Sequence, residues 1–193
     1  MTLLLRRQQL RHQPLRYQQR GTTLIEVLVT FIIMAIGLLG VAGLQTRLQA
    51  SEMEAYQRTQ ALMLVNDMAN RMATNRNAAA SYVIATTGTG AGVTCPTATA
   101  TTVQKDLKDW CNALQGAAET SGGSNVGAMV GGRGCVEDLG SNQYLITVAW
   151  QGLTPIATPP ASVACGAGSY DTANCAGDLC RRTVTTLVNI ATL

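Results

Sequence analysis

The chain has 193 residues, of which 47% are hydrophobic and 13% are charged, and its formal net charge is +3. Residues 1–21 hold five of the 14 basic residues and no acidic residue, which leaves 9 basic against 11 acidic residues beyond them. The basic excess therefore belongs to the N-terminus, and the rest of the chain offers no basic surface for nucleic acid.

The N-terminus pairs a basic stretch with a long apolar one. The five arginines of residues 1–21 hold this end in the cytoplasm, because positive charges beside an apolar span stay on that side. Residues 22–44 contain a single charge, Glu26, and as a helix they would span roughly 30 Å, about one hydrocarbon core. We predict a leader over 1–21, one pass through the inner membrane over 22–44, and a periplasmic C-terminal domain.

Glu26 is unfavourable in a membrane span, because placing a carboxylate at the bilayer centre costs about 2.5–3.5 kcal/mol of free energy. Thr22 lies four residues earlier on the same helical face. A cut after Gly21 would give Thr22 a free ammonium near the carboxylate, and a helix N-terminus also favours an anion. The sequence thus predicts a cut between Gly21 and Thr22, with Glu26 as the partner of the new amine.

Two other kinds of N-terminal signal also combine a basic stretch with an apolar run. In an uncleaved signal anchor Glu26 would reach the cytoplasmic interface, and this alternative stays open. An ordinary secretory signal peptide has a short apolar core before its cut site. Here the apolar run follows Gly21 and is too long for that class of signal.

The junction Arg20-Gly21 followed by TTLIEV at 22–27 resembles the processing motif of type IV prepilins and type II secretion pseudopilins. The resemblance implies that a prepilin peptidase cuts after Gly21 and N-methylates Thr22, and that Glu26 acts in assembly. The chain departs from the family at Thr22, where Phe is usual.

The apolar run continues into a long amphipathic stretch. We predict one helix from about residue 24 to about residue 75, apolar all round in its first half and on one face in its second. Gly37, Gly40 and Gly43 interrupt the first half, either for close helix packing or as a stretch that unwinds in a filament, softest at Gly43. The apolar face of the second half is predicted to comprise Leu44, Leu48, Ala55, Leu62, Val65, Ala69 and Met72.

Residues 61–76 resemble the PilV group of minor pilins through an Asp-Met-x-x-Arg-Met-x-x-Asn pattern. Within it, Asp67 and Arg71 form an i,i+4 pair that adds a few tenths of a kcal/mol. The stretches 148–152 and 180–182 are similar to the same group. The resemblance implies a pilin fold.

Residues 78–193 are predicted to form a periplasmic α+β domain. A short helix is expected over 103–119, with its charged residues, Asp106 among them, facing solvent. Strands are predicted at 143–151, 183–190 and 127–137, and loops at 78–102 and 152–182; the glycine-rich stretch 121–134 ends the helix. A small antiparallel sheet packed on the C-terminal half of the long helix would cover its apolar face.

All six cysteines lie on the predicted periplasmic side, where disulfides persist. They are Cys95, Cys111, Cys135, Cys165, Cys175 and Cys180. Fifteen pairings are open; we favour Cys95–Cys111 and at least one bridge that pins the loop 152–182. A zinc site is disfavoured because the only histidine, His12, lies in the leader and no CxxC pair occurs.

No catalytic arrangement is recognisable, since the mature part lacks a histidine for a triad and any GxSxG motif. We expect no enzyme and no cofactor. The predicted function is that of a minor pilin of a type IV pilus, in or priming a tip complex for twitching motility or adhesion. Its partners would be a prepilin peptidase, major and other minor pilins, a tip adhesin and the inner membrane.

Two alternatives stay open. A minor pseudopilin of a type II secretion system shares the N-terminal motif. A membrane-anchored periplasmic binding protein that never polymerises would show no defect when Glu26 is changed.

Overall fold

The computed structural model describes residues 21, 23–118, 120–125 and 129–191. The first 20 residues of the predicted leader and Thr22 lie outside this range. The chain divides into two compact units, Met1–Gln45 and Thr46–Leu193, which we describe separately. The division falls inside helix α1 (Leu24–Thr74), because the second half of that helix packs with the rest of the chain.

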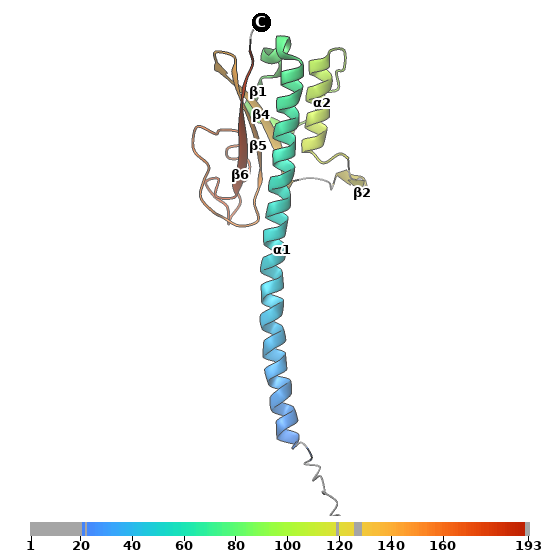
Figure 1. Cartoon of the computed structure of the whole chain (residues 1–193), viewed down its shortest axis with the longest axis vertical. Helices are drawn as coiled ribbons and strands as arrows, with labels where there is room; N and C mark the ends of the chain where they lie inside the picture. Colours follow the sequence, from blue (N-terminus) through green and yellow to red (C-terminus); the bar gives the residue numbers. More distant parts are fainter. Residues whose placement is uncertain (1–20, 22, 119, 126–128, 192–193) are drawn as a thin grey trace, which may run out of the picture. The chain divides into compact units, whose positions relative to one another are not determined.

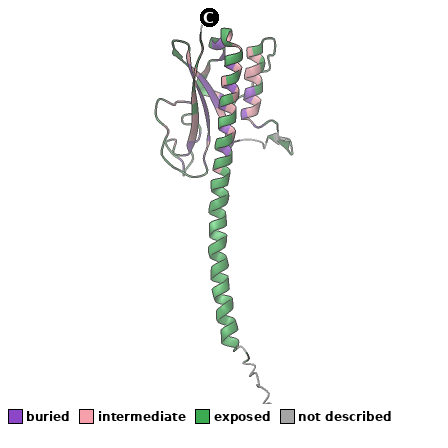
Figure 2. Ribbon diagram, viewed as in Figure 1, coloured by how far each residue is buried: buried purple, intermediate pink, exposed green. Residues whose placement is uncertain are grey.

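The described part of the first unit is an apolar helix with no buried side chain (Figure 2). Leu24, Phe31 and Leu39 are 85%, 67% and 73% exposed, and every other residue of 24–45 is exposed as well. α1 is the one described helix long and apolar enough to cross a membrane.

In the second unit, α1 packs on a four-stranded antiparallel sheet, which confirms the predicted α+β fold class (Figure 1). The sheet has the order β1-β4-β5-β6, and a short helix, η1 (Arg76–Tyr82), links α1 to β1. Helix α2 (Thr102–Leu114) lies beside α1 on the same face of the sheet. The strands are β1 (Ile84–Gly90), β4 (Arg133–Gly140), β5 (Gln143–Gln151) and β6 (Arg181–Asn189).

The main core lies between the helices and this face of the sheet. Trp110 of α2 is fully buried, and its indole Nε1 donates to the Leu64 carbonyl of α1 at 2.9 Å. Its ring lies so close to β4 that a Cβ at Gly134 would come within 2.2 Å of it. The alternating residues of β5 face this core: Tyr144, Ile146, Val148 and Trp150.

The buried face of α1 differs from the prediction. Leu44, Leu48 and Leu62 are 63%, 62% and 43% exposed, and Ala55 is also exposed. The first buried position of the helix is a polar one, Gln57, which lies one turn after Glu54, the residue that pairs with Arg182 of β6. The buried residues are Gln57, Ala61, Val65, Met68 and Met72.

Asp106 was expected to face solvent, and this is wrong. Its side chain is 13% exposed and lies 2.8 Å from Arg71 Nη1, while the Tyr82 hydroxyl donates to its other oxygen at 2.5 Å. Arg71 also pairs with Asp67 at 2.9 Å, as predicted. α2 therefore turns one carboxylate inward to join α1 and η1.

Some elements differ from those expected. β1 falls in a stretch expected to be a loop, and a short hairpin, β2 (Thr120–Ser121) and β3 (Ser124–Asn125), falls in the glycine-rich stretch. α2 stops at Leu114 and does not continue to residue 119; Gly116 follows with a φ of +68°. The predicted strand 127–137 starts later, at Arg133, and residues 126–128 lie outside the described range.

Three disulfides lock the second unit. They join Cys95 to Cys111, which is the pairing the sequence favoured, Cys135 to Cys165, and Cys175 to Cys180. The second bridge fastens the loop 152–180 to the face of the sheet opposite the helices, where Cys135, Ala149, Cys165 and Tyr170 form a smaller core. The sheet is thus packed on both faces.

Candidate processing and assembly site

Thr23 caps α1. Its carbonyl accepts from the backbone N–H groups of Glu26 and Val27 at 3.0 and 3.3 Å, and its Oγ1 lies 3.4 Å from the Glu26 nitrogen. A threonine at the N-cap with glutamate three residues later is the spacing of a capping box. This role of Thr23 was not predicted, although its T-x-x-E spacing to Glu26 is the signal that indicates it.

Gly21 lies just outside this cap and is exposed. A Cβ added there would meet no atom within 4 Å. The described structure therefore contains no packing reason for a glycine at this position. Thr22, the predicted new N-terminus and methylation site, lies outside the described residues.

Glu26 stands in the first turn of α1 and is exposed. Its negative charge is favourable there, because the unpaired N–H groups of a helix start carry partial positive charge. None of the described residues forms an ion pair with it. The nearby Thr30 hydroxyl, by contrast, donates to the Val27 carbonyl at 2.7 Å. Glu26 is thus the one charged residue of the apolar segment, and its exposed carboxylate is accessible to a partner from outside the described residues.

Three glycines lie further along the apolar segment: Gly37, Gly40 and Gly43. A Cβ at any of them would meet nothing within 4 Å. Their small size is therefore not needed for packing among the described residues. Small residues on apolar helices let other helices approach closely.

The comparison with family models matches residues 16–42 to a prokaryotic N-terminal methylation motif. The match includes Gly21, Thr23, Glu26 and most of the exposed apolar helix. No curated protein and no solved structure matched the chain. The match covers the N-terminal segment only, and residues 43–193 lie outside it.

Proposed function

We propose that this chain, which carries the prepilin-type motif of a type IV pilin-like protein, is a minor pilin of the PilV group. In this proposal a prepilin peptidase cuts after Gly21 and methylates Thr22. The mature chain then leaves the inner membrane and joins a pilus with major and other minor pilins, at a tip complex that carries an adhesin. The domain from Thr46 onward would face the periplasm and later the cell surface.

The observation that carries this proposal is the exposed apolar helix of residues 24–44 with its single charge, Glu26. Lipid can cover such a surface before assembly, and the matching helices of neighbouring subunits can cover it afterwards. A carboxylate in that filament core needs a partner, because an unpaired charge there costs several kcal/mol. The ammonium of a processed Thr22, in the same or a neighbouring subunit, would supply it.

The N-terminus of the mature protein tests the cut. We expect intact-mass measurement of membrane-extracted protein to give a chain that begins at Thr22 and carries one extra methyl group. Cells without the prepilin peptidase should yield the full-length chain. An N-terminus at Met1 or Thr2 in cells with an active peptidase would contradict the proposal.

Glu26→Val tests assembly separately from insertion and cutting. The variant makes the segment more apolar and leaves Gly21 intact, so the cut protein should accumulate in the inner membrane. It should be missing from sheared pili, because the partner of the N-terminal amine is lost. The matched control is Glu52→Val, which removes an exposed carboxylate further along the same helix.

Analysis of sheared pili also distinguishes a pilin from a pseudopilin. Wild-type chain in sheared pili indicates a pilin. A pseudopilin would instead be required for secretion and be absent from pili. If Glu26→Val enters pili at the wild-type level, the assembly role of Glu26 is wrong.

A further inference from the structure

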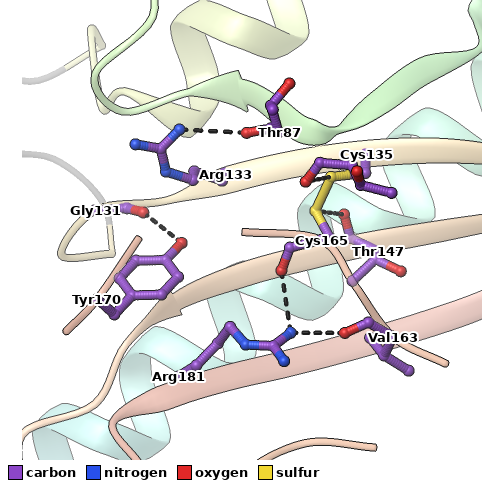
Figure 3. Close-up of a disulfide and its surroundings, with 10 residues drawn as sticks. Thr87, Gly131, Arg133, Cys135, Thr147, Val163, Cys165, Tyr170 and Arg181 are labelled. Carbon is purple, nitrogen blue, oxygen red and sulfur yellow. Dashed lines mark hydrogen bonds between the residues drawn. A yellow bond between two sulfur atoms is a disulfide. The ribbon is translucent and has the colours of Figure 1, made fainter. Parts of the chain in front are cut away.

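Arg181 is a buried arginine on the face of the sheet opposite the helices. It is the first residue of β6 and is 3% exposed. Its Nη1 donates to the carbonyl oxygens of Val163 and Cys165, at 2.6 and 3.2 Å (Figure 3). Its Nε lies 3.1 Å from a carboxylate oxygen of Asp178. The guanidinium thus binds two carbonyls of the loop, that of Cys165 itself and that of Val163 two residues before it.

The bound segment crosses the sheet from edge to edge. At β6 it is held by Arg181, and at β4 Cys165 is bridged to Cys135. At β1 the Gly166 N–H donates to the Thr86 carbonyl at 3.0 Å. Two of these three anchors are noncovalent, so they can form before any cysteine is oxidised.

The native pairing of Cys165 is not the one that chain entropy favours. Its partner Cys135 is 30 residues away, whereas Cys175 and Cys180 are only ten and fifteen residues away. Because closure probability falls with roughly the 3/2 power of loop length, the two nearer cysteines are favoured about fivefold and about threefold. Unguided, Cys165 would choose Cys135 in about one tenth of its pairings among the three.

We propose that Arg181 is a positioning residue for oxidative folding, which selects Cys135 as the partner of Cys165. Arg181 holds the Cys165 carbonyl against the face of the sheet opposite the helices, and this keeps the Cys165 thiol beside β4. The following loop is folded by further bonds, since Asp178 Oδ1 accepts from the Gly168 N–H and Asp171 Oδ1 accepts from the Asp178 N–H, both at 2.8 Å. Cys175 and Cys180 then meet each other.

The redox step itself needs an external disulfide, for which glutathione disulfide serves. One thiolate attacks it, forms a mixed disulfide and releases one glutathione thiolate. The second cysteine's thiolate displaces the other glutathione, so the Cys135–Cys165 bond forms, two electrons pass to glutathione and the two protons end on its thiols. Early closure of Cys175–Cys180 does not end the competition, because a free Cys165 thiolate can attack that bridge by exchange.

The test follows disulfide pairing in the full chain. Protein in detergent is reduced, unfolded and returned to folding conditions with reduced and oxidised glutathione. Free thiols are blocked at short times, and the bridges are identified by peptide mapping. In the wild type most bridged Cys165 should be joined to Cys135, whereas in Arg181→Met that share should fall several-fold, toward about one tenth. Arg181→Lys should fall between them, because one ammonium cannot reproduce the forked set of donors.

Arg182→Met is the matched control. The neighbouring Arg182 donates to the carbonyls of Leu179 and Thr154 and lies near Glu54, and it has no bond to the segment 163–166. Its replacement should leave the partner of Cys165 unchanged. An equal loss of native pairing in both variants would overturn the proposal.

A second background separates partner selection from stability. With Cys175→Ser and Cys180→Ser, the nearby competitors are gone, and Arg181→Met should again form Cys135–Cys165 at the yield of that background alone. If native pairing stays low there, Arg181 acts only through stability and the proposal fails. It also fails if Arg181→Met with all six cysteines pairs like the wild type.

Discussion

Both halves of α1 carry apolar side chains, all round the first half and on one face of the second, and different surroundings must cover them. Residues 24–44 expose their side chains on every side, whereas the turns from Gln57 to Met72 bury one face against the sheet and α2. Hydrophobic composition therefore does not tell which surface a helix contacts. The distribution of apolar residues around the axis does, because a helix that packs on one partner needs only one apolar face.

Covalent cross-links follow the same division. All six cysteines and both tryptophans lie in the second unit, and none lies in the first. We therefore expect the second unit to unfold as a cooperative body whose loss leaves the apolar helix intact in detergent.

Reduction of the disulfides should have the largest effect. The bridges close separations of 16, 30 and 5 residues, and each is worth about 2–4 kcal/mol, which together is comparable to the whole stability of a domain. With dithiothreitol, the near-UV signal of Trp110 and Trp150 should disappear at physiological temperature. The far-UV helical signal of residues 24–44 should remain. An unchanged unfolding midpoint would contradict the role assigned to the bridges.

A matched pair of methionines compares the two halves directly. Met68 is fully buried and Met34 is 62% exposed. Met68→Ala should lower the free energy of unfolding by about 2–5 kcal/mol, because it leaves a cavity in the core. Met34→Ala should leave it unchanged, as measured by urea unfolding in detergent with tryptophan fluorescence. Equal effects would mean that the two units do not unfold independently.

The smallest effect concerns Tyr170, which is 4% exposed and donates its hydroxyl to the Gly131 carbonyl at 2.9 Å. Burial raises the pKa of Tyr170 above its ordinary value. The folded state thus favours the neutral phenol, and this contribution to stability is present below about pH 10 and is lost as the pH rises toward the raised pKa. Tyr170→Phe should cost about 1 kcal/mol at neutral pH and make the alkaline loss of stability shallower.

Tyr56→Phe serves as the control for this change. Tyr56 is 48% exposed on α1, so its replacement should leave the free energy of unfolding at neutral pH nearly as it is in the wild type. Stability is measured by urea unfolding at a series of pH values between about 8 and 11. A slope that Tyr170→Phe leaves unchanged would show that this phenol does not contribute to it.

Much of the architecture could be predicted from local patterns. The long helix, the strand 143–151 and the Asp67–Arg71 pair each depend on residues close in sequence, and all three are present. β1 was missed because its IATTGTG sequence has few bulky β-formers and gains its place from pairing with β4. The inward turn of Asp106 likewise depends on Arg71, 35 residues earlier, which helical periodicity cannot reveal.

In the candidate processing site, too, the features that could be predicted depend on residues close in sequence. Gly21, Glu26 and the apolar run are recognisable from order and spacing alone, and Thr23 could have been added from its spacing to Glu26. The role of Arg181 could not, because its acceptors are carbonyl oxygens of Val163 and Cys165. Backbone acceptors carry no residue-type signal, so only the folded loop reveals them.

The absence of any cysteine in α1 has a mechanical consequence. If α1 is pulled along its axis, the load passes to the rest of the unit through side-chain packing and through the ion pairs Glu54–Arg182 and Arg71–Asp106. Residues 75–94 are the only chain between α1 and the first bridged cysteine, so peeling the helix away could release at most about 70 Å of slack there. The bridged loops cannot lengthen. Under tension α1 would therefore slide along the sheet first. The strands and loops joined by the three disulfides would extend last.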